Sequence, residues 1–158
     1  MRRHDEAERA LRRALELNPN FALAYAVLGL PLAIHGGHEE AVKIAGHAIR
    51  LSPNDPLIGY YASLATTSAH FTAGNYAGSV ASSRHMIERY PDRQWGYYYL
   101  IAAAEMQKDT VTAREALATV LRLRPDFSLA WLREDMACAE EVGERLLRSL
   151  RRAGVPEN

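Results

Sequence analysis

Residues 20–53 read NFALAYAVLGLPLAIHGGHEEAVKIAGHAIRLSP, and the pattern in this stretch decides the fold. Its first half is apolar with many small residues, and its second half repeats apolar residues at intervals of three and four. The pair Gly36-Gly37 separates the halves, and Pro53 follows the second half. Because these intervals match the helical period and proline cannot continue a helix, the stretch predicts two helices joined by a tight turn.

The same proline step recurs along the chain at a nearly constant interval. Its four occurrences each follow a predicted helical stretch, and the prolines lie 34, 38 and 34 residues apart: Asn18-Pro19, Ser52-Pro53, Tyr90-Pro91 and Arg124-Pro125. A period of this length is typical of stacked units that bury their apolar faces against one another. The sequence therefore predicts a tandem array of helix pairs, each ended by a proline turn.

The segments before three of these prolines are alike. Residues 7–17, 41–51 and 113–123 each carry small and apolar residues at the helical interval, so each is predicted to be an amphipathic helix. A small residue lets a neighbouring helix approach closely, where a larger side chain would clash. The residues expected to do so are Ala7, Ala14, Ala41, Ala45, Ala48 and Ala113.

Two of the units carry a longer motif. One reads Tyr25-x2-Leu28-Gly29-x2-Leu32, Ala41-x3-Ala45 and Pro53, and the other reads Tyr97-x2-Leu100-Ile101-x2-Ala104, Ala113-x3-Leu117 and Pro125. The motif resembles the tetratricopeptide repeat, although the second unit lacks the glycine. The resemblance covers about residues 4–131. It implies an all-α fold in which antiparallel helix pairs stack into a right-handed superhelix with a C-terminal capping helix.

The middle unit, residues 54–91, is four residues longer than its neighbours. Its first helix can be framed in two ways, with the motif starting at Tyr61 or, counted back from the next proline, at Ser63. The apolar stripe of this helix favours the frame that starts at Tyr61. We therefore expect an extra turn at the start of this helix, with Asp55 as N-cap and Pro56 at the first helical position.

The N-terminal segment, residues 4–19, matches only the second half of a unit. Leu11, Leu15 and Leu17 would then lack part of the cover that a preceding helix gives. Each large aliphatic side chain left exposed forfeits about 1.5–3 kcal/mol. The chain is therefore expected to be a fragment of a longer protein, or to cover this face by self-association or with a partner. A frayed first helix is the alternative.

The C-terminal segment, residues 126–158, breaks the period. Residues 127–132 begin like another first helix, which Arg133-Glu134-Asp135 should interrupt, and residues 139–153 form an amphipathic helix with Gly154 as its C-cap. We interpret this last helix as the cap that keeps the end of such an array soluble. Its basic side, interpreted as a solvated face rather than a nucleic-acid contact, consists of Arg145, Arg148, Arg151 and Arg152.

These segments make up one predicted tetratricopeptide domain over residues 1–158. Its parts are a half repeat at 4–19, repeats at 20–53, 54–91 and 92–125, and a partial helix with a capping helix at 126–158.

The resemblance also implies a binding surface, because the first helices of such units line a concave groove that holds a peptide or a helix. Carried over by position, the groove residues are Leu23, Ala26, Leu30 and Ala33 in one unit and Trp95, Tyr98, Ala102 and Glu105 in another. Trp95 and Tyr98 are the strongest candidates, since exposed aromatic residues supply much of an interface's affinity. For Leu23 and Leu30, a place in the core between helices is the alternative.

The expected groove is largely apolar. Chaperone-binding members of the family grip a C-terminal carboxylate with charged and amide side chains on the first helices. The corresponding positions here include Ala26 and Leu30, which cannot donate such hydrogen bonds. An apolar or amphipathic helix is therefore the expected ligand.

Composition excludes several other classes. Lys plus Arg and Asp plus Glu both number 19, so the formal net charge of zero gives no general attraction to nucleic acid or to an anionic membrane. The N-terminus carries no apolar signal segment, and no stretch approaches the roughly 20 apolar residues that span a bilayer. The single cysteine, Cys138, favours a reducing compartment, so we expect a cytoplasmic protein.

No catalytic, metal or cofactor site is expected. Cys138 has no recognisable His and Asp constellation beside it in a motif. His35 and His38 flank the glycine pair in a turn, without further metal ligands that the sequence can place. The glycines lack the Lys-Ser/Thr step that a phosphate-binding loop needs. The chain is therefore interpreted as a protein-interaction scaffold and not as an enzyme.

Two stretches resemble a more specific group. Residues 50–56, RLSPNDP, and residues 144–157, ERLLRSLRRAGVPE, are similar to the C-terminal repeat region of bacterial class III adenylate cyclases and related winged-helix transcriptional regulators. In those proteins a catalytic or DNA-binding domain precedes the repeats. A regulatory region of such a bacterial cyclase or regulator is therefore the second hypothesis.

Overall fold

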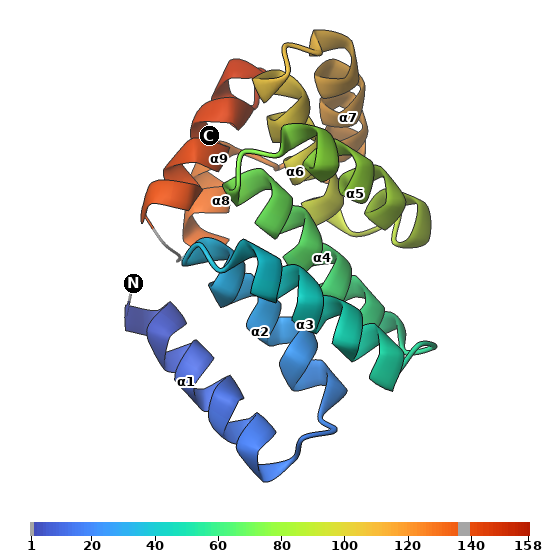
Figure 1. Ribbon diagram of the computed structural model, residues 1–158. Coiled ribbons are helices and arrows are strands. Elements are labelled where there is room, and N and C mark those ends of the chain that lie inside the picture. Colours follow the sequence, from blue (N-terminus) through green and yellow to red (C-terminus); the bar gives the residue numbers. More distant parts are fainter. Residues whose placement is uncertain (1, 136–139) are drawn as a thin grey trace. The chain divides into compact units, whose positions relative to one another are not determined.

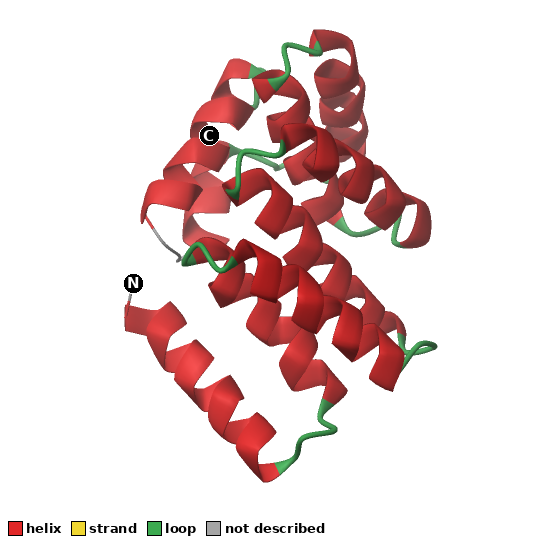
Figure 2. Cartoon of the chain, viewed as in Figure 1, coloured by secondary structure: helices red, strands yellow, loops and turns green. Residues whose placement is uncertain are grey.

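In the computed structural model, which describes residues 2–135 and 140–158, every regular element is a helix (Figure 1). The helices are α1 (Arg2–Leu17), α2 (Ala22–Ile34), α3 (His38–Leu51), α4 (Pro56–Thr72), α5 (Tyr76–Arg89), α6 (Gln94–Met106), α7 (Thr110–Leu123), α8 (Leu129–Asp135) and α9 (Glu140–Arg152). Figure 2 shows that short loops join the helices from α1 to α8, and the predicted all-α class is confirmed. Within these described residues, no helix combines the length and apolar character that crossing a bilayer requires.

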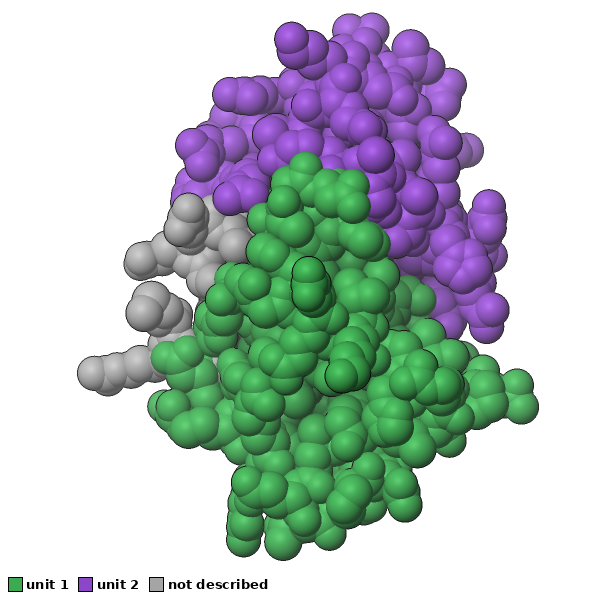
Figure 3. All heavy atoms as spheres, in the orientation of Figure 1, with its two compact units in different colours: residues 1–75 green, residues 76–158 purple. Residues whose placement is uncertain are grey.

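The chain divides into two compact units, residues 1–75 and residues 76–158 (Figure 3). The first contains α1 to α4 and the second contains α5 to α9. Their boundary falls between α4 and α5, inside the predicted repeat at residues 54–91. The division of the chain into one domain of successive repeats stays a prediction.

All four predicted proline turns are present. Each proline lies two residues beyond the end of a helix, after α1, α3, α5 and α7. In each turn the carbonyl of the residue before proline accepts a hydrogen bond from the backbone N–H three residues later, with N···O distances between 3.0 and 3.4 Å. Proline therefore occupies the second position of a β-turn, where its fixed φ fits. The same local rule ends the second helix in every unit.

Small residues bring α2, α3 and α4 close together in the first unit. The alanines at their contacts are at most 1% exposed, and they include Ala26, Ala45, Ala48, Ala62 and Ala65. Thr72 in α4 adds a hydrogen bond between helices, since its hydroxyl donates to the carbonyl of Ala33 in α2 at 2.9 Å. The expected role of small residues in close packing is confirmed for these three helices.

α1 lies alongside α2 and covers one end of this core (Figure 1). Leu11 and Leu15 are half-buried and pack against a cluster that contains Leu28 and Leu32. Leu17, in contrast, is 72% exposed, so the expectation that this helix lacks part of its cover is confirmed there. Ala7, which was expected to admit a neighbouring helix, is exposed as well.

The extra turn expected in the middle unit is the first turn of α4. This helix has 17 residues, four more than the 13 residues of α2 and of α6. Asp55 caps it, because its carboxylate accepts hydrogen bonds from the backbone N–H groups of Leu57 and Ile58 at 2.9 and 3.3 Å. Pro56 occupies the first helical position, where no N–H is needed. Both predictions for this start are confirmed.

α6 is the central helix of the second unit. Residues 96–104 along it are all buried, and α5, α7 and α9 pack around it. A helix that is apolar on every side is stable only when other elements enclose it. Ile101, which stands where the first motif has Gly29, has no exposed surface.

α9 packs against α6 through a stripe of leucines and ends as predicted. Leu146, Leu147 and Leu150 are at most 4% exposed. Gly154 has a φ of +95°, and the N–H of Val155 donates to the carbonyl of Leu150 at 3.1 Å. A positive φ at this position is the usual conformation of a glycine C-cap.

One expectation for the C-terminal region is wrong. Arg133-Glu134-Asp135 does not interrupt a helix, because α8 runs from Leu129 through Asp135. Charged residues are tolerated on an exposed helix face, and Arg133 lies 3.7 Å from the carboxylate of Glu157. Cys138 and the predicted start of the capping helix at residue 139 lie outside the described residues.

Candidate interaction surfaces

The predicted groove residues of α2 differ in accessibility. Ala26 and Ala33 have no exposed surface, because neighbouring helices cover them. Leu23 and Leu30 are half-buried and pack against the edge of the cluster that contains Ala26. These two leucines therefore contribute to the core and also present an apolar edge to solvent.

The predicted groove residues of α6 divide in the same way. Trp95 and Glu105 are half-buried, whereas Tyr98 and Ala102 have no exposed surface. The ring of Tyr98 stacks on the ring of Phe127, with centroids 4.5 Å apart and planes 6° from parallel. The exposure expected for Tyr98 is therefore not found, since Phe127, in the segment before α8, covers its ring.

Trp95 is supported from beneath by two tyrosines. Its ring meets the ring of Tyr98 edge to face, with centroids 5.5 Å apart, and lies 6.2 Å from the ring of Tyr99. Such pairs contribute roughly 0.5–1.5 kcal/mol beyond the area they bury. Trp95 is thus an aromatic side chain that is partly open to solvent but held in place by its neighbours.

A second half-buried tryptophan was missed by the sequence reasoning. Trp131 in α8 lies 6.4 Å from Phe127, and the guanidinium carbon of Arg124 lies 3.8 Å from the centre of its indole ring. An arginine this close to a tryptophan face makes a cation–π contact. The four-residue spacing of Phe127 and Trp131 was the available signal, but the contact with Arg124 depends on the turn at Pro125.

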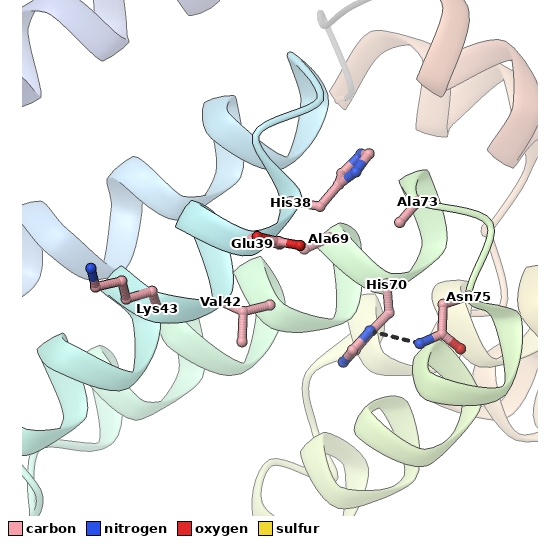
Figure 4. A pocket seen from close by; sticks show the side chains of 8 residues that line it. All are labelled: His38, Glu39, Val42, Lys43, Ala69, His70, Ala73 and Asn75. Carbon is pink, nitrogen blue, oxygen red and sulfur yellow. Dashed lines mark hydrogen bonds between the residues drawn. The ribbon is translucent and has the colours of Figure 1, made fainter.

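A pocket opens on the first unit between the start of α3 and the end of α4 (Figure 4). Its volume is about 430 Å³. Its apolar lining comes from Val42, Ala69 and Ala73. Polar side chains complete the lining: His38, Glu39, Lys43, His70 and Asn75.

The turn after α4 shapes one side of this pocket. Gly74 has a φ of +76°, and the backbone N–H of Asn75 donates to the carbonyl of His70 at 2.9 Å. The side-chain nitrogen of Asn75 lies 3.3 Å from Nδ1 of His70, as the dashed line in Figure 4 shows. An apolar lining with a few polar groups around it is typical of ligand pockets in general. Sequence reasoning missed this pocket because its two walls come from different helices.

Contacts between polar side chains join α1 to the end of α2. His35 lies 3.2 Å from a carboxylate oxygen of Glu8 and 3.4 Å from one of Asp5. A hydrogen bond from Arg12 lowers the pKa of Glu8, and His35 adds to that effect. The same bond raises the pKa of Arg12. His35 therefore links two helices, and among residues 2–135 and 140–158 no group of three or more His, Cys, Asp or Glu is placed to hold a metal ion.

Comparison with known proteins identifies the fold. No family model matches the chain, and no curated protein matches its sequence. Among solved structures, MamA 41-end from Desulfovibrio magneticus RS-1 superposes with a TM-score of 0.62 at 18% identity, covering 96% of this chain and 87% of that one. The MamA RS-1 ArsTM double mutant gives the same TM-score and identity, covering 95% of this chain and 86% of that one. The fold is of the tetratricopeptide type. These comparisons support the tetratricopeptide resemblance but not the resemblance to adenylate cyclases and regulators.

Proposed function

We propose that this tetratricopeptide-type protein is an interaction scaffold, and that α6 contacts an apolar or amphipathic helix of a partner protein through Trp95. The observation that carries the proposal is the placement of Trp95, which is half-buried and packs at 5.5 Å on the fully buried Tyr98. Tryptophan is among the residues that most often dominate binding energy in protein interfaces.

The contacts of the Trp95 ring with Tyr98 and Tyr99 should lower the entropy cost of binding. A side chain that is already immobilised loses less conformational entropy on binding than a mobile one, and this loss is about 0.5–1.5 kcal/mol for a flexible side chain. The rings of Tyr98 and Tyr99 restrict the indole before any partner arrives. More of the energy gained by burying the indole is then available for affinity.

The half-buried leucines of α2 form a second proposed contact of the same character. Leu23 and Leu30 lie seven residues apart on one helix, so they lie on the same face, about two turns from each other. An apolar stripe with this spacing suits the apolar face of another helix. In this proposal the buried Ala26, Ala33 and Ala102 support the contact residues from within the fold.

The experiment selects peptides that bind the full-length chain from a displayed library of random peptides and measures their affinities for wild type and for Trp95→Ala. Val111→Ala is the matched control, because Val111 is an apolar residue of α7 in the same unit and is 65% exposed. Loss of a dominant aromatic residue costs about 2 kcal/mol or more in binding, which corresponds to about thirtyfold in affinity.

We expect the selected peptides to bind Trp95→Ala about thirtyfold more weakly or worse, and to bind Val111→Ala as they bind wild type. A fluorescence measurement adds a direct readout, because Trp95 and Trp131 are the only tryptophans. In Trp131→Phe, peptide binding should shift the emission of Trp95 to shorter wavelength as water leaves its ring. The proposal would be refuted if no peptide were enriched, or if the enriched peptides bound Trp95→Ala as tightly as wild type.

A second candidate function is a regulatory region of a bacterial nucleotide cyclase or transcription regulator. The observation that favours it is the resemblance of residues 50–56 and 144–157 to the repeat region of those proteins. Genomic sequence upstream of Met1 decides the matter. An in-frame cyclase or winged-helix domain upstream would support this candidate. The lack of either domain there would exclude it.

A further inference from the structure

Residues 155–157 form a strap that folds back over the start of α8. The N–H of Leu129 donates to the carbonyl of Pro156 at 2.8 Å, and the N–H of Ala130 donates to the carbonyl of Glu157 at 3.0 Å. The first N–H groups of a helix have no acceptor within the helix itself. The strap therefore supplies acceptors that α8 would otherwise lack.

The side chains of the strap add a buried contact and a charged one. Val155 is 4% exposed. The carboxylate of Glu157 accepts two hydrogen bonds from the guanidinium of Arg151 in α9, at 2.5 and 3.4 Å, and lies 3.7 Å from the guanidinium of Arg133 in α8. The Arg151 hydrogen bond lowers the pKa of Glu157, so this carboxylate is charged at neutral pH. The strap thus connects the end of α9 with α8.

α8 depends on this support because it is short. It has seven residues, and an isolated helix of that length is not stable in water. Burial of Leu129 and Leu132 holds one side of the helix, and the strap holds its start. The ion pairs of the strap are open to solvent, and such pairs contribute little stability. A segment held by so few contacts opens at a lower free energy than the core does.

The start of α8 is adjacent to the residue that covers Tyr98. Phe127, two residues before α8, is 1% exposed, and its ring stacks on the ring of Tyr98 with centroids 4.5 Å apart. The ring of Tyr98 in turn supports the ring of Trp95, with centroids 5.5 Å apart. Detaching the strap would release Leu129, and with it the neighbouring Phe127. The contacts therefore run from the strap through Phe127 and Tyr98 to the proposed contact residue.

We propose that the strap is a latch that regulates the Trp95 surface. In the closed form residues 155–157 hold α8 and α6 binds its partner, and in the open form the strap is detached and affinity is lost. This inference rests on the proposed function, because it concerns the same surface and the same partner. Coupling between two events is reciprocal, so a partner that binds only the closed form must stabilise the closed strap by the same factor.

Hydrogen exchange of backbone amides in the full-length chain measures how often the strap opens. The amides of Leu129 and Ala130 donate to the strap and report its opening. The amide of Ile101, in the wholly buried centre of α6, reports unfolding of the whole unit. We expect weaker protection at Leu129 and Ala130 than at Ile101.

Glu157→Gln tests the charged contact of the strap. This substitution removes the carboxylate but keeps the backbone carbonyl that accepts from Ala130. Protection at Leu129 and Ala130 should therefore fall about three- to fivefold. Glu115→Gln is the control, because it removes an exposed carboxylate of α7 in the same unit and should leave this protection unchanged.

A peptide selected on the full-length chain tests the coupling between the strap and the Trp95 surface. At thirty times its dissociation constant, the peptide should raise protection at Leu129 and Ala130 about thirtyfold, because only the closed form binds it. If the open form bound the peptide as well, protection would rise at Ile101 and stay unchanged at Leu129 and Ala130.

A double variant detaches the strap in the full-length chain. Val155→Asp/Glu157→Arg introduces a charge at a buried position and places a third cation beside Arg133 and Arg151. Asn158→Arg is the control, because it gives the same change in net charge at an exposed residue next to the strap. We expect the peptide to bind the double variant at least about tenfold more weakly and the control as it binds wild type. Circular dichroism checks the helix content; if the double variant unfolds, Glu157→Gln and the peptide-induced protection decide.

A readout without any peptide separates the action of the strap from the proposed function. Trp131→Phe leaves Trp95 as the only tryptophan. In this background Val155→Asp/Glu157→Arg should shift the emission of Trp95 to longer wavelength, because its ring loses the support of Tyr98.

Three results would each overturn the inference. They are equal protection of Leu129, Ala130 and Ile101, a bound peptide that leaves Leu129 and Ala130 unchanged, and a detached strap that alters neither peptide affinity nor the emission of Trp95. A shifted emission in a chain for which no binding peptide is found would instead count against the proposed function, while the action of the strap on Trp95 would stand.

Discussion

Gly29 of α2 lies directly against Ala65 of α4, and a Cβ built on Gly29 would be 2.5 Å from the Cβ of Ala65. The same Cβ would lie 3.5 Å from the carbonyl oxygen of Ala41 in α3. Helices α2, α3 and α4 therefore approach one another closely at Gly29, where only the hydrogen of a glycine fits. This convergence explains why the best-matching repeat has glycine at this place in its motif.

Gly29→Ala should destabilise the chain. Alanine is favoured over glycine inside a helix by about 1 kcal/mol, but overpacking a close contact costs about 1–3 kcal/mol. The clash should win here, because the atom opposite is the Cβ of a buried alanine and cannot rotate away. The measurement is the midpoint of urea unfolding, which should fall.

Gly46→Ala is the matched control for this substitution. Gly46 lies inside α3, and a Cβ there would meet only the end of the flexible Arg50 side chain, at 3.5 Å. Helix propensity should then dominate and raise stability by about 0.5–1 kcal/mol. Equal effects of the two substitutions would contradict the packing argument.

Tyr98→Ala should destabilise the second unit far more than Trp95→Ala. Tyr98 is wholly buried and stacked on Phe127, and truncating a buried aromatic side chain costs roughly 3–5 kcal/mol. Trp95 is half-buried, so its loss should cost about 1–2 kcal/mol. Thermal unfolding followed by circular dichroism separates the two. Replacing both Trp95 and Tyr98 by alanine would unfold the surface whose binding is being tested. Binding therefore has to be measured with Trp95→Ala alone.

Asp55→Ala should destabilise α4 by about 1 kcal/mol. The carboxylate accepts two backbone hydrogen bonds from the first turn, and alanine leaves both donors without that acceptor. Asp92→Ala, in the exposed turn before α6, is the control. The urea midpoint should fall for Asp55→Ala and stay nearly constant for Asp92→Ala; the reverse order would show that the cap does not stabilise this helix.

Local backbone rules were readable from the sequence, whereas contacts between distant segments were not. The turns at the four prolines, the cap at Asp55 and the C-cap at Gly154 each depend on a few adjacent residues, and all were predicted. The burial of Tyr98 depends on Phe127, which comes from a turn beyond the next helix. The pocket that includes His38 and His70 needs two helices to be packed before it exists. Position in a repeat indicates which helix carries a residue, but the neighbouring segment decides whether solvent reaches it.

Acid should reduce the stability that Glu8 contributes through its contacts with Arg12 and His35. Glu8 contacts Arg12 at 2.9 Å and His35 at 3.2 Å, and the Arg12 hydrogen bond in particular holds the pKa of Glu8 below its ordinary value of 4.5. Asp5 and Glu40 complete the charged groups around this contact, beside His35 and Arg12 respectively. A carboxylate with a lowered folded-state pKa adds stability above its ordinary pKa and loses it as the pH falls through the lower value.

Comparison of wild type with Glu8→Gln tests this pH dependence. At neutral pH wild type should be the more stable of the two, and the difference in thermal midpoint should shrink as the pH falls below about 4.5, where Glu8 itself becomes neutral. A difference that stays constant down to acid pH would mean that the charge of Glu8 does not contribute to the stability of the folded chain.

Self-association through α1 is the last prediction, and Leu17 is the residue that tests it. Leu17 is 72% exposed, while Leu11 and Leu15 of the same helix are half-buried against the core. A second copy that covers this side chain would recover up to about 2 kcal/mol of burial energy. Because association also costs translational and rotational entropy, dimers are expected only at high protein concentration. Sedimentation velocity over a range of concentrations should show wild type growing in mass and Leu17→Ser remaining monomeric. Val111→Ser, which changes a similarly exposed apolar residue in the other unit, should associate as wild type does. If wild type stays monomeric at every concentration, the exposed leucine is either tolerated as it stands or covered by a different protein.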